Sequence, residues 1–341
     1  MFDATFPWSN WVEPTNIAAQ PLIACRGLTK HFSLPRGIFG RPRIVRAVED
    51  VTLQLERGET LGLVGESGCG KSTFGRTLLQ LIPSTAGTII VEGLDVTGLS
   101  DRQLRPWRRR IQIVFQDPYS SLDPRMTVQQ LVAEPLIINK IGTNTRERSD
   151  IVKELLFQVG LRSDSLSRYP HEFSGGQRQR IGIARALSVR PEYIVCDEPL
   201  GALDVSIQAQ IVNLLLDLRD KFGIGYLFIS HDLDVVRFIS QRIAVMYLGR
   251  IVEVGTTQAI TEAPRHPYTK ALLDAIPVPD PKRRKRVTLL GGDVPNPIEP
   301  PPGCAFHPRC WRMLQGKCNI EAPPLVLGDM GRQVACWNPI E

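Results

Sequence analysis

The sequence has no apolar run that approaches the roughly 20 residues required for a membrane-spanning helix. Its longest apolar stretches, such as Ile243 to Leu248, have the length of β-strands. Hydrophobic residues make up 43% and charged residues 22% of the 341 residues, which is typical of globular proteins with one large core or two smaller ones. We therefore expect that any role in transport depends on a membrane pore built from other chains.

The first 20 residues lack the pattern of a secretory signal peptide. They carry acidic side chains at Asp3 and Glu13, and no basic region precedes an apolar one. They also show little hydrophobic periodicity. We expect no signal peptide and interpret residues 1–20 as a loosely ordered N-terminal extension.

The chain has no Cys-x-x-Cys pair, and its number of cysteines is odd. It has seven cysteines, of which four lie near the C-terminus: Cys304, Cys310, Cys318 and Cys336. The odd number argues against a disulfide framework and for a reducing compartment such as the cytosol. Four thiolates in a proline-rich segment could hold a [4Fe–4S] cluster or Zn²⁺, or could remain free thiols.

The net charge of +6 includes one concentrated basic run, Lys282 to Arg286. Such a run can bind nucleic acid or anionic lipid, or it can be a solvated linker. We favour the linker and expect no nucleic-acid partner.

The most informative stretch that is present is Gly65-Glu66-Ser67-Gly68-Cys69-Gly70-Lys71-Ser72. It follows the phosphate-loop pattern of Gly, any four residues, then Gly-Lys-Ser. The apolar run from Thr60 to Val64 predicts a buried strand before the loop, and the apolar spacing from Thr73 to Leu81 predicts a helix after it. The glycines let backbone N–H groups turn toward phosphate oxygens, and the helix N-terminus adds partial positive charge.

Two residues of this loop have specific expected roles. Lys71 would reach the β- and γ-phosphates of a nucleotide, and Ser72 would hold Mg²⁺ through its hydroxyl. A glycine-rich turn that binds nothing is the alternative. Because the loop stands between a predicted strand and a predicted helix, we expect a nucleotide site.

A second group of polar residues follows other apolar strands. The strand from Tyr193 ends at Asp197, where phosphate-loop enzymes place the carboxylate that supports Mg²⁺. Glu198 is next and is expected to be the general base that polarises the attacking water, a contribution of about 10²–10⁴-fold. His231 would orient the γ-phosphate or that water, and Gln116 would contact Mg²⁺ or the water. The alternative for each is an ordinary polar residue at a strand end.

Ser174-Gly175-Gly176-Gln177 precedes a helical pattern and indicates a second anion-binding turn. One chain needs only one phosphate loop to bind one ATP. A second phosphate-reading turn therefore implies contact with the nucleotide of another subunit. The alternative is a plain helix cap with Ser174 as the N-cap residue.

Hydrophobic periodicity predicts the remaining elements. Strands are expected at 22–32, 47–55, 88–91, 111–115 and 225–230, a hairpin at 243–254, and helices at 128–136, 151–159, 177–187 and 204–222. Few strand signals occur between 126 and 188, which indicates a helical insertion. Past about residue 262 the proline content rises and the periodicity fails, which indicates an extension.

Taken in order, these motifs resemble the ATP-binding cassette (ABC) family over residues 22–255. The residues that carry the resemblance are Gly65 to Ser72, Gln116, Ser174 to Gln177, Asp197-Glu198, Ala202-Leu203-Asp204 and His231. The resemblance implies an α/β phosphate-loop NTPase core with an antiparallel β subdomain, a helical subdomain and a C-terminal Cys-containing extension. It also implies a head-to-tail dimer in which each ATP lies between the phosphate loop of one subunit and the Ser174–Gln177 turn of the other.

The family also assigns roles to residues. Phe32 would stack on adenine, with a place in the apolar core as the alternative, and Gln116 would couple to transmembrane subunits. Gly201 departs from the family, which usually has Ser or Thr there. The expected nucleotide contacts are Phe32, Gly65, Glu66, Ser67, Gly68, Cys69, Gly70, Lys71, Ser72, Thr73, Ser174, Gly175, Gly176 and Gln177. The expected catalytic residues are Lys71, Gln116, Glu198 and His231, and the expected Mg²⁺ ligands are Ser72, Gln116 and Asp197.

The expected domain organisation has four parts. An N-terminal extension (1–20) precedes an ATPase core formed by 21–125 and 190–261. A helical subdomain with the Ser174 turn (126–189) is inserted in that core, and a four-cysteine extension (262–341) follows it.

Longer motifs narrow the resemblance to the dipeptide/oligopeptide permease branch. They are Gly65 to Thr73, Val114 to Pro124, Arg265 to Thr269, Pro295 to Pro297 and Gly303 to Cys310. The branch implies a peripheral ATPase at the cytoplasmic face of the inner membrane. Its partners would be a second cassette subunit, two transmembrane permease subunits and an extracytoplasmic solute-binding protein. The branch also favours [4Fe–4S] for the four C-terminal thiols, in a structural or regulatory role.

Two alternative functions remain. An importer ATPase for nickel chelates, glutathione or antimicrobial peptides would share this site, because solute choice lies in the pore and the capture protein. A non-transport ABC ATPase that acts on nucleic acid or ribosomes is disfavoured, because such proteins usually carry two cassettes or a long coiled coil, and this chain has neither. The sequence leaves open whether the partner cassette is identical or a paralogue.

Overall fold

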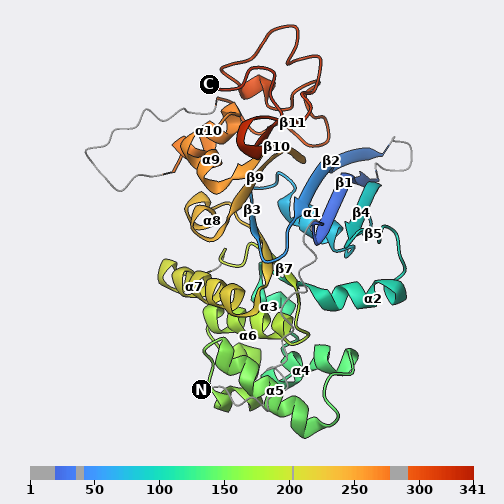
Figure 1. Cartoon of the computed structure of the whole chain (residues 1–341), viewed down its shortest axis with the longest axis vertical. Helices are drawn as coiled ribbons and strands as arrows, with labels where there is room; N and C mark the ends of the chain where they lie inside the picture. The colour runs from blue at the N-terminus through green and yellow to red at the C-terminus, as the bar shows by residue number, and fades with distance from the viewer. Residues whose placement is uncertain (1–19, 36–41, 202, 277–290) are drawn as a thin grey trace, which may run out of the picture. The chain divides into compact units, whose positions relative to one another are not determined.

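A computed structural model describes residues 20–35, 42–201, 203–276 and 291–341 (Figure 1). Apart from Gln20, the expected N-terminal extension lies outside the described residues, as do Ala202 and the basic run from Lys282 to Arg286. Within the described part, no helix has both the length and the apolar character needed to cross a membrane.

The chain forms two compact units that are discontinuous in sequence. The unit that we call the helical unit contains the described residues up to Leu22, Glu56–Glu59 and Leu99–Leu227. The unit that we call the sheet unit contains Ile23–Leu55, Thr60–Gly98 and Phe228–Glu341. The domain boundaries expected near residues 126, 190 and 262 remain predictions.

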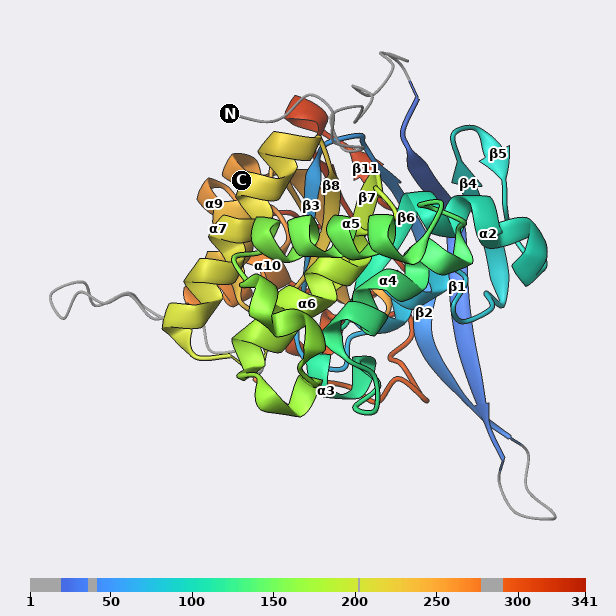
Figure 2. The same cartoon turned by 90° about the horizontal axis from the view of Figure 1, so that it is seen from below.

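The sheet unit contains a four-stranded antiparallel sheet in the order β2-β1-β4-β5. Its strands are β1 (Ile23–Leu34), β2 (Arg43–Leu55), β4 (Ala86–Val91) and β5 (Leu94–Asp95). Ile23 pairs with Leu55 and Leu34 with Arg43, so β1 and β2 run alongside each other over their whole length (Figure 2). Buried residues alternate with exposed ones along the second half of β2, because one face of the sheet covers the core. This sheet confirms the antiparallel part of the expected fold.

The same unit contains a second sheet, ordered β11-β12-β10-β9-β3 and followed by the end of β8. The strands are β3 (Thr60–Val64), β9 (Arg242–Tyr247), β10 (Arg250–Thr256), β11 (Val326–Leu327) and β12 (Gln333–Val334), and of β8 (Gly225–Ile229) the residues Phe228 and Ile229 belong to this unit. Strands β3 and β9 pair in parallel, and β9 and β10 form the expected hairpin. Every residue of β3 is buried, which is typical of a parallel strand in a sheet that is covered on both faces.

Helices and 3₁₀ turns complete the sheet unit. They are α1 (Lys71–Leu78), α8 (Leu233–Ile239), α9 (Thr257–Glu262), α10 (Pro267–Asp274), η3 (His307–Arg309) and η4 (Asp329–Gly331). Helix α10 was not predicted, because its periodicity is short and follows a proline. Pro267 occupies the first turn, where a missing N–H costs nothing, and His266 Nδ1 caps the helix by accepting the Tyr268 N–H at 3.0 Å.

The C-terminal segment is joined to the sheet as well. Strand β12 pairs with β10, with Val334 beside Glu253, and the Ala335 N–H donates to the Val252 carbonyl at 2.8 Å. The end of the extension therefore covers an edge of the second sheet.

The helical unit is built on two parallel strands and a group of helices. Strand β6 (Ile111–Val114) pairs with β7 (Tyr193–Asp197), with Ile111 beside Tyr193 and Val114 beside Cys196. The helices are α2 (Asp101–Arg110), α3 (Pro118–Ser121), α4 (Val128–Ile138), α5 (Thr145–Gln158), α6 (Gly175–Leu187) and α7 (Val205–Phe222), with η1 (Ser163–Ser167) and η2 (Pro170–Glu172). Helices α4, α5 and α6 pack against one another (Figure 2).

The four helices expected in this unit are confirmed, whereas α2 was not predicted. Its sequence is rich in arginine, and Leu104 is its only buried residue, so it has no apolar periodicity. Its start is set by a capping box between Ser100 and Gln103.

The connection from β3 to α1 depends on two close backbone contacts. A Cβ atom at Gly65 would lie 2.2 Å from the Met246 carbonyl oxygen, and one at Gly70 would lie 2.0 Å from the Ala47 carbonyl oxygen. Gly70 also has φ +108°. Gly68 has φ +77°, but a Cβ atom there would meet no other atom within 4 Å. Glycine is therefore required at 65 and 70 by lack of space and at 68 by backbone conformation alone.

We predict that Gly70→Ala destabilises the protein more than Gly68→Ala. Alanine at 68 costs only the left-handed conformation, about 1–2 kcal/mol, whereas alanine at 70 must also displace the Ala47 backbone. Urea unfolding of both variants beside the wild type measures the difference. Equal losses of unfolding free energy would contradict the contact at Ala47.

Candidate active site

The N-terminus of α1 opens onto the loop formed by Gly65 to Ser72. Its N-cap residue is Gly70, so no side chain satisfies the first N–H groups, and no acidic residue lies in the first turn. Ser72 and Thr73 are half-buried at this end of the helix. A helix start that lacks a side-chain cap and carries partial positive charge favours an anion.

Lys71 is folded over the loop. Its side chain is 4% exposed, and Nζ donates to the carbonyl oxygens of Gly65 at 2.9 Å and Glu66 at 3.0 Å. The ammonium is therefore held inside the curve of the loop. A phosphate group in this curve would meet both the ammonium and the helix N-terminus.

Cys69 contributes to the loop through its backbone and its packing. The side chain is buried, and burial raises the pKa of the thiol. The thiol therefore stays protonated at neutral pH and does not act as a nucleophile.

Glu66 is held by two residues to which the sequence assigned no role. Its N–H donates to the Tyr268 hydroxyl at 2.8 Å. Its carboxylate accepts two hydrogen bonds from Arg309, from Nη1 at 2.8 Å and Nη2 at 3.1 Å. Tyr268 and Arg309 lie in two of the motifs on which the resemblance to the permease branch was based. The sequence therefore singled out these motifs but did not predict that they contact the phosphate loop.

His231 follows β8 in the sheet unit. The Ser230 N–H donates to the Leu63 carbonyl at 3.2 Å, which places the end of β8 beside the end of β3. The carboxyl ends of both strands therefore meet at one edge, where ligands bind in open α/β sheets. The His231 side chain is exposed at this edge, and Asp232 caps α8 behind it.

Phe32 lies on β1, where it pairs with Val45. Its side chain is half-buried, and Lys30 Nζ lies 4.8 Å from the ring centroid. Phe32 is therefore not a core residue, and its assignment to adenine stacking stays a prediction.

Gln116 and Glu198 meet in the helical unit. Gln116 Nε2 donates to Glu198 Oε2 at 2.9 Å. They come together because β6 and β7 are parallel and both residues follow the carboxyl ends of these strands. Glu198 has φ +46°, a conformation that costs a non-glycine residue about 1–3 kcal/mol and often marks a functional position. Asp197, which ends β7, is completely buried.

Ser174 forms the helix cap that the sequence left as an alternative. Its hydroxyl accepts the Gln177 N–H at 3.4 Å, and Gln177 Oε1 accepts the Ser174 N–H at 3.0 Å. Ser174, Gly175 and Gln177 are nevertheless exposed. A Cβ atom at Gly176 would lie 2.4 Å from Ile207 Cγ2, so this glycine is required by packing against α7.

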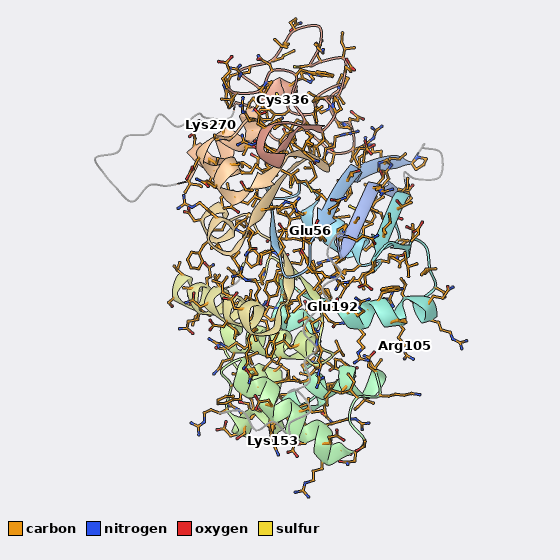
Figure 3. All side chains as sticks on the ribbon, in the orientation of Figure 1. Glu56, Arg105, Lys153, Glu192, Lys270 and Cys336 are labelled. Carbon is orange, nitrogen blue, oxygen red and sulfur yellow. The ribbon has the colours of Figure 1, made fainter. Side chains whose placement is uncertain are left out.

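The four C-terminal cysteines share one loop-rich segment, in which Figure 3 labels Cys336. The Cys304 N–H donates to the Cys318 carbonyl at 2.8 Å, and Cys318 Sγ accepts the Leu314 N–H at 3.3 Å. Burial raises the pKa values of Cys304 and Cys336 to about 11. In the part of the chain that the structure describes, no group of three or more His, Cys, Asp or Glu side chains is arranged to hold a metal ion.

Comparison with known proteins gives two family matches. Residues 48–201 match the family described as ABC transporter, and residues 252–318 match the oligopeptide/dipeptide transporter, C-terminal region. The second match contains Tyr268 and Arg309, and it contains three of the four C-terminal cysteines.

Relatives match along nearly the whole chain. The chain is 53% identical over 316 residues to the "Probable peptide ABC transporter ATP-binding protein y4tS" of Sinorhizobium fredii, covering 92% of this chain and 89% of the relative. It is 48% identical over 318 residues to the dipeptide transport ATP-binding protein DppF of Haemophilus influenzae, covering 93% of this chain and 97% of the relative.

A solved structure shares the fold. The dimeric ATP-binding cassette MJ0796 in a post-hydrolysis state bound to ADP and Pi is 31% identical, with a TM-score of 0.62 over 69% of this chain and 98% of that one. The ABC ATPase fold predicted from the sequence is therefore confirmed, and its ATPase chemistry follows from membership. The chain belongs to the ABC transporter family, as an ATP-binding subunit of the oligopeptide/dipeptide branch.

Proposed function

We propose that this ATPase drives the import of di- and oligopeptides through separate transmembrane subunits. The observation that carries the proposal is the order of the two family matches, in which a cassette is followed by the C-terminal region of oligopeptide/dipeptide transporters. The names of the two relatives, which refer to peptide and dipeptide transport, support the same cargo.

The proposal includes an assembly. A second cassette, identical or paralogous, would pair head to tail with this one, and two transmembrane permease subunits would form the pore. A solute-binding protein outside the membrane would deliver the peptide. This chain would then be a peripheral subunit at the cytoplasmic face of the inner membrane, because ATP is supplied on that side.

Glu198 is the proposed general base. Its contact with Gln116 supports this role, because an amide 2.9 Å from the carboxylate holds it in place without neutralising it. Gln116 would report on the state of the site to the transmembrane subunits. His231, exposed at the end of β8, would orient the γ-phosphate and the attacking water.

The loop from Gly65 to Thr73 is the proposed phosphate site. Lys71 would exchange its two carbonyl contacts for phosphate oxygens, and the N–H groups at the start of α1 would bind the same anion. Ser72 and Asp197, with Gln116, are the proposed Mg²⁺ ligands, and their oxygen atoms are the donors that Mg²⁺ prefers. The ion would neutralise charge between the β- and γ-phosphates.

Two further contacts to the nucleotide are proposed. Phe32 would stack on adenine. The exposed turn at Ser174, Gly175 and Gln177 would bind the γ-phosphate held by the other cassette. A helix cap and an anion site are compatible, because the cap uses the Gln177 N–H and leaves other donors of the first turn for the ligand.

We predict that Glu198→Gln binds ATP with near wild-type affinity and hydrolyses it about 10²–10⁴-fold more slowly. The substitution preserves size and hydrogen bonding but removes the basic oxygen. Single-turnover hydrolysis and equilibrium ATP binding on the same preparation separate the two effects. Turnover close to that of the wild type would remove Glu198 from the role of base.

We expect the complete transporter, purified from membranes, to contain a second cassette and two transmembrane subunits. In lipid vesicles, its ATP hydrolysis should rise when the solute-binding protein is loaded with peptide. If nickel chelates or glutathione stimulated hydrolysis instead of peptide, the proposed cargo would be wrong, but the proposed role in transport would stand. Recovery with ribosomes or nucleic acid, and without membrane proteins, would contradict import.

The four C-terminal cysteines are the proposed ligands of a [4Fe–4S] cluster. The donor set has the right chemistry, because four cysteine thiolates are the usual ligands of a [4Fe–4S] cluster. Their arrangement in the described residues does not form a ready metal site. Binding would therefore require the sulfur atoms to move closer together and lose their protons.

We predict that protein purified without oxygen absorbs visible light and contains about four iron atoms per chain. Cys318→Ser should lower both signals, whereas Cys25→Ser, which alters a buried cysteine in β1, should leave them unchanged. A colourless and iron-free sample that still hydrolyses ATP would reject the cluster.

A further inference from the structure

Glu66, the second residue of the phosphate loop, is held in place by residues from the C-terminal part of the chain. Arg309 and Tyr268 both contact Glu66, one through the carboxylate and the other through the backbone N–H. Arg309 follows Glu66 by 243 residues, so the contact arises from tertiary structure alone. All three residues belong to the sheet unit.

The pair between Arg309 and Glu66 has the geometry of a strong interaction. Both guanidinium nitrogens contact the carboxylate, and the Arg309 side chain is only 7% exposed, compared with 24% for Glu66. Bidentate pairing with limited solvent screening fixes the direction of the carboxylate as well as its distance.

An aromatic cluster packs around Tyr268, and Arg309 Nη1 donates to the hydroxyl of one of its members, Tyr247, at 3.5 Å. The rings of Tyr247, Tyr268 and Phe306 lie with centroids 4.6 to 5.4 Å apart, and His266 lies 5.7 Å from Phe306. Burial lowers the pKa of His266 to about 3, so this ring is neutral and the cluster carries no competing cation. The cluster joins β9, α10 and the segment between Cys304 and Cys310.

These contacts restrain the loop at the point where it leaves β3. The Tyr268 hydroxyl accepts the N–H on one side of the Glu66 Cα atom, and the Glu66 carbonyl on the other side accepts Lys71 Nζ at 3.0 Å and the Cys69 N–H at 3.2 Å. A shift of the Glu66 backbone would therefore displace both the lysine and the curve of the loop. A loop that is already in its binding conformation loses less entropy when it takes up a ligand.

We propose that Arg309 and Tyr268 are positioning residues for the phosphate loop, so that the four-cysteine segment is a working part of the ATP site. The inference rests on the proposed function in one respect, namely that the loop from Gly65 to Ser72 binds ATP. Arg309 acts through Glu66 and does not itself touch the nucleotide.

The test compares two arginines of the same segment in the full-length chain. Arg309→Gln breaks the pair with Glu66. The control, Arg312→Gln, removes a guanidinium that donates to Asn338 and Pro339 near the chain end. MgATP binding is measured by titration calorimetry, steady-state hydrolysis gives KM and kcat, and thermal unfolding reports on the fold.

We expect Arg309→Gln to raise Kd and KM for ATP about tenfold and to change kcat by less than about twofold, because the restraint acts on binding. Arg309→Lys should recover part of the affinity, since it restores the charge without the bidentate geometry. Tyr268→Phe should weaken binding in the same direction, and Arg312→Gln should match the wild type. An unchanged Kd in Arg309→Gln would overturn the proposal.

A double-mutant cycle covers the case in which Arg309→Gln does not fold. Glu66→Gln breaks the same pair from the exposed side and should weaken ATP binding to a similar degree. The double variant should bind no more weakly than either single variant, because the two substitutions remove one interaction. Wild-type affinity in Glu66→Gln would overturn the proposal independently.

One further variant separates this inference from the assignment of the ATP site. Lys71→Ala should abolish MgATP binding. If it does so while Arg309→Gln binds normally, the loop is the ATP site and only the positioning role fails. If Lys71→Ala binds normally, the loop is not the ATP site, and the positioning role fails with it.

Discussion

The tight backbone curve between β3 and α1 is the constraint on which the proposed ATP site depends. Gly65 and Gly70 pass so close to neighbouring carbonyl groups that no side chain fits at either position. The curve brings the ammonium of Lys71 onto the loop carbonyls and leaves the helix N-terminus without a side-chain cap. This backbone geometry concentrates positive electrostatic potential at a preorganised site. The side chains between Gly65 and Gly70 contribute less to that potential than the backbone does.

A parallel pair of strands has the same organising effect in the helical unit. Because β6 and β7 run in one direction, the residues that follow them emerge at one edge, and Gln116 meets Glu198 there. The buried strand ends in Asp197, and the chain then takes a left-handed conformation at Glu198. The strained turn restrains the Glu198 backbone and the hydrogen bond from Gln116 orients its carboxylate, which is the preorganisation that the proposed role as general base would need.

The C-terminal segment has few regular elements, and polar contacts attach it to other parts of the sheet unit. Strand β12 extends the sheet at β10, and Arg309 contacts the phosphate loop. Within the segment, Arg312 contacts the chain end at Asn338. The aromatic cluster around Phe306 supplies the apolar part of this attachment. The residues between Cys304 and Cys310 include both Phe306 and Arg309, so this short stretch supplies the apolar and the ionic part of the attachment.

The sequence by itself determined the phosphate loop, the four longest helices and the family, because these depend on local spacing: glycines at fixed offsets, apolar periodicity, and polar residues directly after apolar strands. It missed α2, whose arginines carry no periodicity, and it assigned no contact to Tyr268 or Arg309. It also left the Ser174 turn open between a cap and an anion site, and the structure shows the cap. Only the tertiary structure decided that Glu66 is held by a guanidinium 243 residues away, because the meeting of two distant side chains depends on how strands and rings pack, and no local pattern records it.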